Sequence, residues 1–167
     1  MEVTRASFPS KQEVAKSSEL VITVRNRESD KTVPNVAVSV QGFDTKVDNP
    51  NLADPRRPVF VANGEPVNVG GLPEARSAEP KGGETAYANT WALGPLRPGQ
   101  ERTFRWGVTA VRPGKYDVSY TVAASLTGKA KAVGPGGQAP TGSFKGTVDR
   151  STPNVSVGPD GKSVVTE

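Results

Sequence analysis

The chain has 167 residues, with 21 Lys and Arg against 17 Asp and Glu, and it contains neither Cys nor His. It therefore has no Ser-His-Asp or Cys-His nucleophile, no His or Cys zinc site and no disulfide. It holds 23 Val but 6 Leu and 1 Ile, together with 18 Gly and 15 Pro. Valine is stiff at χ1 and packs well on pleated sheets, so the composition predicts one β-rich domain, residues 1–167, large enough to bury a core.

No apolar run approaches the roughly 18–20 residues that a membrane-spanning helix needs. Residues 1–4 also lack the apolar segment of a signal peptide. We therefore expect the chain to be a fragment of a larger protein, and any membrane attachment to lie in a segment outside it.

Two strands are expected in the first quarter of the chain. Glu19–Arg25 places Leu20, Ile22 and Val24 on one face, and Val36–Val40 alternates in the same way. The polar segment between them ends in the turn Val33-Pro34-Asn35.

Residues 43–89 interrupt this regularity and are rich in Asp, Asn, Pro and Gly. We interpret them as a long loop or hairpin insertion, because structureless connections of that length are uncommon and often functional. Within them Val59–Val69 contains Asn63-Gly64, a strong hairpin signal, and Pro66, which confines the returning strand to a sheet edge.

Regular alternation returns after residue 90. The turn Arg97-Pro98-Gly99 precedes a strand with Phe104, Trp106 and Val108 on one face. A second turn, 112–114, precedes a strand whose corresponding face carries Tyr116, Val118, Tyr120 and Val122. Gly134–Gly142 is expected to be a mobile loop, and a further strand follows through Phe144, Gly146 and Val148. The tail, about residues 155–165, is expected to form a hairpin, and several short strands without helices predict a β-sandwich.

The turn-and-strand pattern resembles the bacterial CARDB-type immunoglobulin-like module. The matching segments are Leu96–Gln100, Phe104–Trp106 and Gly114–Val118, with the strand Leu20–Asn26 and Val33–Val36 in the first half. More loosely, the chain is similar to extracytoplasmic domains of actinobacterial membrane proteins, which carry segments like 52–58 and 90–94. The resemblance implies an Ig-like sandwich, exported and facing the cell surface, that serves adhesion or assembly.

Two groups of side chains are candidate ligand sites. Phe104, Trp106, Tyr116 and Tyr120 are compatible with an aromatic platform, but their same-face alternation favours the sandwich core. The surplus positive charge lies in residues 101–131, where the basic residues are spaced singly and do not form a polybasic run. This spacing favours a solvated face over contact with an anionic envelope polymer or nucleic acid. These basic residues are Arg102, Arg105, Arg112, Lys115, Lys129 and Lys131.

Other chemistry has weaker support. The oxygen-rich side chains Asp44, Asp48, Asn49, Asn51 and Asp54 do not have EF-hand spacing and are better explained as turn residues than as a Ca²⁺ site. No phosphate-binding loop or S-x-x-K motif is present. A Lys–Asn isopeptide cross-link remains an alternative, but the sequence does not indicate which Lys and Asn would form it.

We therefore expect a non-catalytic module without metal or cofactor. It would bind a protein partner or an anionic wall polymer, not nucleic acid, through loops or an edge strand. The expected contact residues, in or beside the insertion, are Asp54, Arg56, Arg57, Phe60 and Trp91. A purely structural spacer and a carboxylate-dependent hydrolase of envelope glycans are the alternatives.

Overall fold

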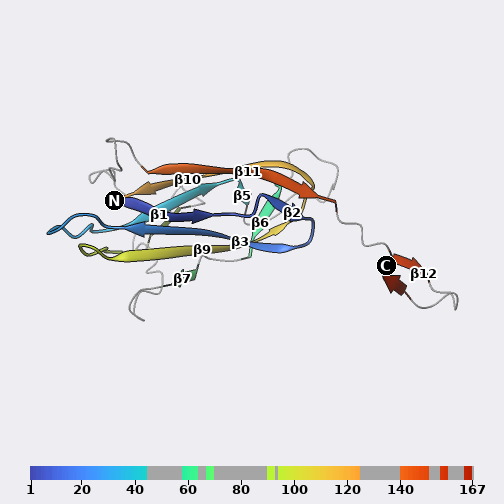
Figure 1. Cartoon of the computed structure of the whole chain (residues 1–167), viewed down its shortest axis with the longest axis horizontal. Helices are drawn as coiled ribbons and strands as arrows, with labels where there is room; N and C mark the ends of the chain where they lie inside the picture. Colours follow the sequence, from blue (N-terminus) through green and yellow to red (C-terminus); the bar gives the residue numbers. More distant parts are fainter. Residues whose placement is uncertain are drawn as a thin grey trace.

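The computed structural model describes residues 1–44, 58–63, 67–69, 90–92, 94–124, 140–150, 155–157 and 164–166. Every regular element among them is a β-strand, and most of the strands form two facing sheets (Figure 1). The all-β sandwich expected from the sequence is therefore confirmed. None of the described residues forms a helix that could span a membrane.

The first sheet has the order β1-β3-β9-β6-β5, and β7 also pairs with β9. Its strands are β1 (Glu2–Ser7), β3 (Ser17–Arg25), β5 (Phe43–Asp44), β6 (Phe60–Ala62), β7 (Val67–Val69) and β9 (Glu101–Ala110). The second sheet has the order β2-β11-β10-β4-β8. Its strands are β2 (Lys11–Glu13), β4 (Ala37–Gln41), β8 (Thr90–Ala92), β10 (Gly114–Ala123) and β11 (Thr141–Asp149).

The N-terminal segment is divided between the two sheets. β1 runs antiparallel to β3 in the first sheet, and β2 runs parallel to β11 in the second. Pro9 lies between them, where its missing N–H suits a break in the ladder. The crossing is held by the amide of Thr147, which donates to the carbonyl of Ser10 at 2.9 Å.

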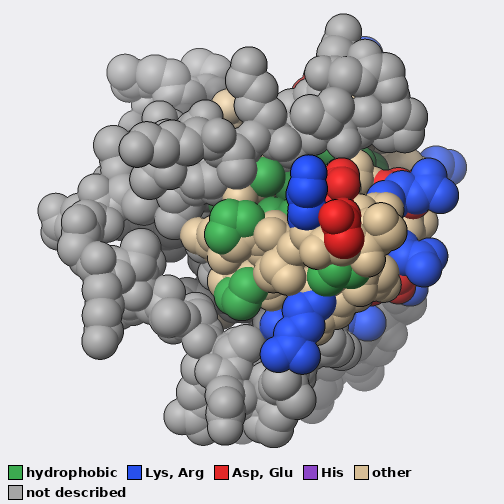
Figure 2. Space-filling model, turned by 90° about the vertical axis from the view of Figure 1, so that its left-hand side faces the viewer, with side chains coloured by type: hydrophobic (Ala, Val, Ile, Leu, Met, Phe, Trp, Pro, Cys, Tyr) green, Lys and Arg blue, Asp and Glu red, His purple; other side chains and the backbone are tan. Residues whose placement is uncertain are grey.

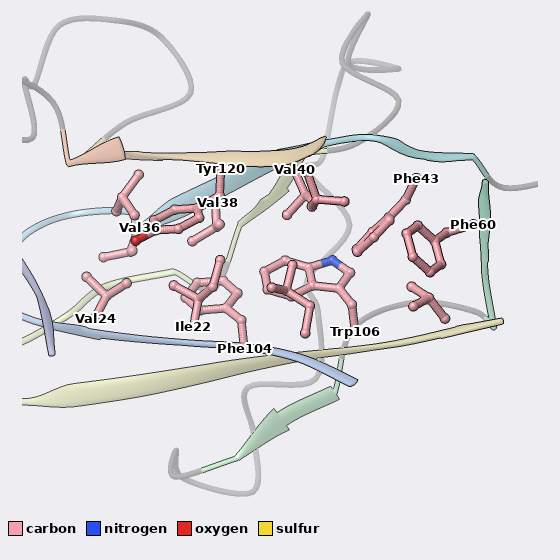
Figure 3. Packing of buried hydrophobic residues seen from close by; sticks show 14 of the residues in the cluster. Ile22, Val24, Val36, Val38, Val40, Phe43, Phe60, Phe104, Trp106 and Tyr120 are labelled. Atoms are coloured by element: carbon pink, nitrogen blue, oxygen red, sulfur yellow. The ribbon is translucent and has the colours of Figure 1, made fainter. Parts of the chain in front are cut away.

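The core fills the space between the sheets, as the alternating patterns of β9 and β10 predict. Figure 3 shows Ile22, Phe104 and Trp106 of the first sheet pointing toward Val38 and Tyr120 of the second. The rings of Phe104 and Trp106 are stacked, with centroids 5.7 Å apart. Both side chains are essentially inaccessible to solvent. The core interpretation of the predicted aromatic face is therefore confirmed.

A second group of aromatic rings fills one end of the core. Phe8, between β1 and β2, contacts Phe43, Phe60, Tyr116 and Phe144, with centroid distances from 5.3 to 6.1 Å. Most of these contacts are edge-to-face, the arrangement that the ring quadrupoles favour. The group joins five separate segments of the chain and fixes this end of the sandwich.

The opposite end is held by Asn26, which is fully buried. Its Nδ2 donates to the carbonyls of Lys31 and Leu96 at 2.8 and 2.9 Å. Its main chain bonds to Gln100 and Gly99 at 3.0 and 2.9 Å. The buried polar groups of Asn26 are thus paired, as buried polar groups usually are. Their hydrogen bonds connect the loop after β3 to the turn before β9.

The predicted hairpin in Val59–Val69 is wrong. β6 and β7 both run antiparallel to β9 and therefore run in the same direction, one after the other along that strand. Between them the amide of Asn63 donates to the carbonyl of Gly107 at 2.8 Å, and its Oδ1 accepts from Thr109 Oγ1 at 2.8 Å. Asn63 thus continues along β9 instead of turning back.

Part of the expected insertion, residues 43–89, belongs to the sandwich itself. β5 and β6 complete the first sheet, and Phe43 and Phe60 lie in the core. The segments 45–57 and 70–89 lie outside the described residues.

Near the C-terminus, β12 (Val155–Val157) pairs antiparallel with β13 (Val164–Thr166), within the stretch expected to form a hairpin. β11 begins at Thr141, inside the predicted loop 134–142, because its first residues pair with β10. Residues 134–139 lie outside the described part of the chain.

Candidate interaction groove

The structure places only one of the predicted contact residues in full. Phe60 is completely buried, and its ring lies 5.1 Å from that of Tyr116, so it is a core residue and not a contact residue. Trp91 lies in β8, where its backbone pairs with Val38, but its side chain is outside the description. Asp54, Arg56 and Arg57 also lie outside the described residues.

A groove opens where the chain leaves the second sheet for the first. β4 ends at Gln41, and β5 starts two residues later in the other sheet, where it pairs with β6. Gly42 makes this crossing possible with a φ of 104°, in the left-handed region. A Cβ there would also lie 3.0 Å from the carbonyl oxygen of Asp117, so only glycine fits this close approach to β10.

The departure of β4 leaves half of β10 with one neighbour among the described strands. β11 pairs with β10 from Gly114 to Thr121, whereas β4 pairs with it only from Ser119 to Ala123. Residues 114–118 therefore have no described strand on the β4 side. On this side Gly42 lies against Asp117 and Val118, and no described strand pairs with residues 114–116, next to the groove.

The backbone of Lys115 and Asp117 faces this opening. Alternate residues of a strand direct their N–H and C=O groups to opposite sides. The amide of Val122 donates toward β11, to the carbonyl of Pro140 at 2.8 Å. Lys115 and Asp117 have the opposite parity, and the nearness of the Asp117 carbonyl to Gly42 agrees with that direction.

The groove has a volume of about 430 Å³. One wall is the crossing segment 41–44, the other is Lys115–Asp117, and Pro58 and Val59 complete the lining. Asp44, Lys115 and Asp117 are exposed, and the Asp117 carboxylate accepts an ion pair from Lys145 Nζ at 3.2 Å. The groove lining thus combines backbone groups of β10 with charged side chains of both signs.

Tyr116 forms the inner part of this wall. Its hydroxyl donates to the carbonyl of Pro9, which also accepts from Gln12 Nε2 at 2.9 Å. Burial raises the pKa of Tyr116 above its ordinary value, and the hydrogen bond with Gln12 opposes this effect. The tyrosine therefore stays neutral and anchors the groove wall to the N-terminal crossing.

The basic residues of segment 101–131 do not form one surface. Arg105 lies on the outer face, paired with Glu19 at 3.0 Å, and Lys115 borders the groove. Arg102 points inward and is 7% exposed, so the expectation of a solvated face is wrong for this residue. Its position on β9 has the same parity as Phe104 and Trp106, which sets this direction. Lys129 and Lys131 lie outside the described residues.

Charges of both signs also cover the end of the sandwich opposite the groove. Figure 2 shows Lys and Arg side chains next to Asp and Glu side chains around small groups of hydrophobic ones. One of the pairs in the structure joins Arg27 Nε to Glu2 at 3.2 Å. The mixture gives this end no single-signed patch among the described side chains.

Of the residues considered for Ca²⁺, Asp44 alone lies in the described part of the chain. Within that part, no group of three or more His, Cys, Asp or Glu side chains is arranged to hold a metal ion. Asp44 instead borders the groove.

Sequence reasoning missed the groove because it depends on which strand ends first. The only local signal was Gly42, directly after a regular valine strand, since glycine at such a position often marks a bend or a close approach of two backbones.

The strand order has the pattern of an immunoglobulin-like sandwich. β1, β3, β9 and β6 correspond to strands A, B, E and D, and β11, β10 and β4 correspond to G, F and C. A solved CARDB domain from Pyrococcus furiosus, crystallised with two metal ions, matches 87% of this chain and 90% of its own, with a TM-score of 0.50 and 15% identity. This chain has a CARDB-like, immunoglobulin-like fold.

An uncharacterised immunoglobulin-like protein from Nocardia farcinica matches 85% of this chain and 96% of its own, with a TM-score of 0.32 and 12% identity. A family 123 glycoside hydrolase from Clostridium perfringens matches over 23% of its length and 87% of this chain, with a TM-score of 0.44 and 16% identity. No protein-family model matches the sequence, and no curated protein is similar enough to count as a match.

Proposed function

We propose that this CARDB-like domain is a non-catalytic interaction module on the extracytoplasmic side of a bacterial envelope protein, and that its partner is another protein. The observation that carries the proposal is the groove beside β10, with its backbone edge and exposed charges. Directional hydrogen-bonding groups of this kind suit a polypeptide better than a uniform polyanion. The dispersal of Arg102, Arg105 and Lys115 over different faces also favours a protein over an anionic wall polymer.

The experiment is site-specific photo-crosslinking in the cell of origin, with the full-length protein. A photoreactive residue is placed at Asp44 or Lys115 in the groove, or at Glu28, which is exposed in the loop after β3. We expect a defined protein adduct from the groove positions and none from Glu28. Equal labelling at all three positions, or no adduct at any, would contradict the proposal.

The location is tested on the same strains. Protease added to intact cells or wall-stripped cells should cleave the domain without lysis, while a cytoplasmic control protein stays intact. Cleavage only after lysis would rule out the extracytoplasmic side.

A carboxylate-dependent hydrolase is the second candidate, because Asp44 and Asp117 both line the groove. Glycosidases use two carboxyl groups, one of which serves as a proton donor in apolar surroundings. Here both side chains are exposed and Asp117 is paired with Lys145, so the binding role is favoured. Release of sugars from wall glycans that is lost in both Asp44→Asn and Asp117→Asn would reverse this preference.

A further inference from the structure

We propose that Arg102 is the centre of a binding site for one small monovalent anion, a halide or a carboxylate, at the end of the sandwich opposite the groove. No residue of the groove takes part, so the site is independent of the proposed function. It follows from the position of the guanidinium in the core and from its unpaired N–H groups.

The strand register places Arg102 in the core. It lies directly opposite Val24 in the pairing of β3 with β9 and has the same parity as Phe104, so its side chain enters the space between the sheets. Val24 and Val36 are fully buried at this end of the core (Figure 3). Arg102 is only 7% exposed and therefore carries a positive charge into apolar surroundings.

The guanidinium of Arg102 has unused hydrogen-bond donors. Its Nε and Nη1 are sealed from solvent and have no partner. Among the described carboxylates at this end, Glu101 has the opposite parity on β9 and is exposed, and Glu2 is paired with Arg27 at 3.2 Å. Arginine stays protonated, so the burial is not relieved by loss of the charge. An unpaired buried charge is unfavourable, and a bound counter-ion offsets this penalty.

The main-chain acceptors of the loops at this end are paired with neutral donors. The carbonyl of Leu96 accepts from the amide of Val33 and from Nδ2 of Asn26, both at 2.9 Å. The carbonyl of Asn26 accepts from the amide of Gly99 at 2.9 Å. These described carbonyls are neutral and do not supply the negative charge that the guanidinium lacks.

The ion that fits this site is small and carries one charge. Nη2 is not among the sealed nitrogens, so the guanidinium reaches the surface on that side. An ion that enters there also contacts Nη1, because the two nitrogens form the terminal fork of the side chain. One guanidinium neutralises one negative charge, whereas a sulfate or phosphate dianion would keep an unpaired charge beside the core valines.

Urea unfolding tests the site, with sodium chloride and sodium acetate as the probes. Each salt is titrated into the wild type, Arg102→Met and Arg27→Met, and sodium sulfate holds the ionic strength constant. An anion that binds only the folded state raises the folded-to-unfolded ratio as its concentration exceeds Kd. Relative to Arg102→Met, we expect a rise of about tenfold in the wild type and in Arg27→Met by about 0.5 M of the preferred anion.

The comparison with Arg102→Met removes general salt effects, because these act on all three proteins. A stronger response to chloride identifies a halide site, and a stronger response to acetate identifies a site for a carboxylate group. An equal response of the wild type and Arg102→Met to both probes would overturn the proposal. A response that is kept in Arg102→Met and lost in Arg27→Met would place the ion on the surface and would overturn it as well.

Side-chain NMR of the wild type keeps the proposal testable even if Arg102→Met does not fold. The Nε–H resonance of Arg102 should shift and saturate with the same anion and the same Kd as the stability. The Nε–H resonance of Arg97, which is exposed at the same end, is the internal control and should not saturate. An Arg102 resonance that does not change during either titration would overturn the site.

Discussion

At the residue scale, two glycines on β11 show how closely the second sheet packs. Gly142 lies opposite Tyr120 and Gly146 lies opposite Tyr116 in the β10–β11 register. A Cβ on Gly142 would be 2.5 Å from the Tyr120 ring, and one on Gly146 would meet the Ser10 carbonyl and lie 2.5 Å from the Tyr116 hydroxyl. The tyrosine rings occupy the space that these glycines leave.

Gly146→Ala should therefore lower the free energy of unfolding by about 1–3 kcal/mol, because the obstructing atom of Ser10 is backbone. The matched control is Gly107→Ala on β9, where the nearest atoms to a Cβ belong to Asn63 and lie 3.6–3.7 Å away. Urea unfolding of both variants measures the difference. Equal stability of the two variants would show that the N-terminal crossing yields easily.

Arg102 is a charged residue whose side chain is largely buried. Its Nε and Nη1 are sealed from solvent and have no hydrogen-bond partner. Arginine cannot lose its charge to relieve this, and an unpaired buried polar group is costly.

Arg102→Met keeps the aliphatic volume and removes the charge, so we expect it to stabilise the domain by about 1–3 kcal/mol. Arg27→Met is the control, since its guanidinium forms an exposed ion pair with Glu2 and contributes little. Thermal and urea unfolding in low-salt buffer give the comparison. A less stable Arg102→Met variant would show that this guanidinium has an anionic partner in solution.

At the scale of elements, the stretch 43–89 contains short strands of the first sheet as well as the segments 45–57 and 70–89, which lie outside the described residues. β5, β6 and β7 pair within the first sheet, and Phe43 and Phe60 pack in the core. Composition alone marked the whole stretch as an insertion, because Asp, Asn, Pro and Gly surround these short strands.

Deletion of residues 43–89 should therefore unfold the domain, since it removes core side chains worth several kcal/mol. Replacement of residues 45–57 alone by a short Gly-Ser linker should leave a cooperative unfolding transition. Circular dichroism during thermal unfolding separates the two results. A folded 43–89 deletion would mean that β9 needs no partner on its β6 side.

At the scale of the whole molecule, stability depends on tyrosines buried between the sheets. Burial raises the pKa of Tyr120, as it does that of Tyr116, above the ordinary value of 10.0. The folded state thus holds its phenol protons more tightly than the unfolded chain. Their contribution is fully present below about pH 10, the ordinary tyrosine pKa, and is lost as the pH rises through the folded-state pKa.

We expect the free energy of unfolding to fall between about pH 9 and pH 11, and to fall less steeply in Tyr120→Phe. Lysine deprotonation affects both proteins, so the difference between their slopes isolates the tyrosine. Urea unfolding at matched ionic strength across this range provides the measurement. Parallel slopes would show that Tyr120 ionises freely in the folded state.

Much of this architecture follows from local sequence. The alternation in Glu19–Arg25 and in the two strands after the Pro-Gly turns follows directly from the two-residue period of a strand, and the structure confirms it. The buried aromatic face also follows from local alternation, because Phe104 and Trp106 are two residues apart on one strand and stack in the core.

What local sequence could not decide is which strands become neighbours. Asn63-Gly64 is a good turn signal, yet Asn63 bonds to Gly107 and Thr109 because β9, more than 40 residues away, offers a longer ladder than the predicted hairpin. Arg102 is polar in the sequence and buried in the fold, because the parity of β9 outweighs the preference of one side chain. The candidate groove is likewise a tertiary feature.

The β class, the alternating faces, the Pro-Gly turns and the absence of His and Cys chemistry follow directly from the amino-acid sequence, because each depends on residue type or on neighbours within a few positions. That β4 leaves β10 at Gln41 and crosses to the other sheet is a property of the tertiary structure. The groove beside this crossing results from the unequal lengths of two strands that are distant in the chain. No local pattern encodes such a difference.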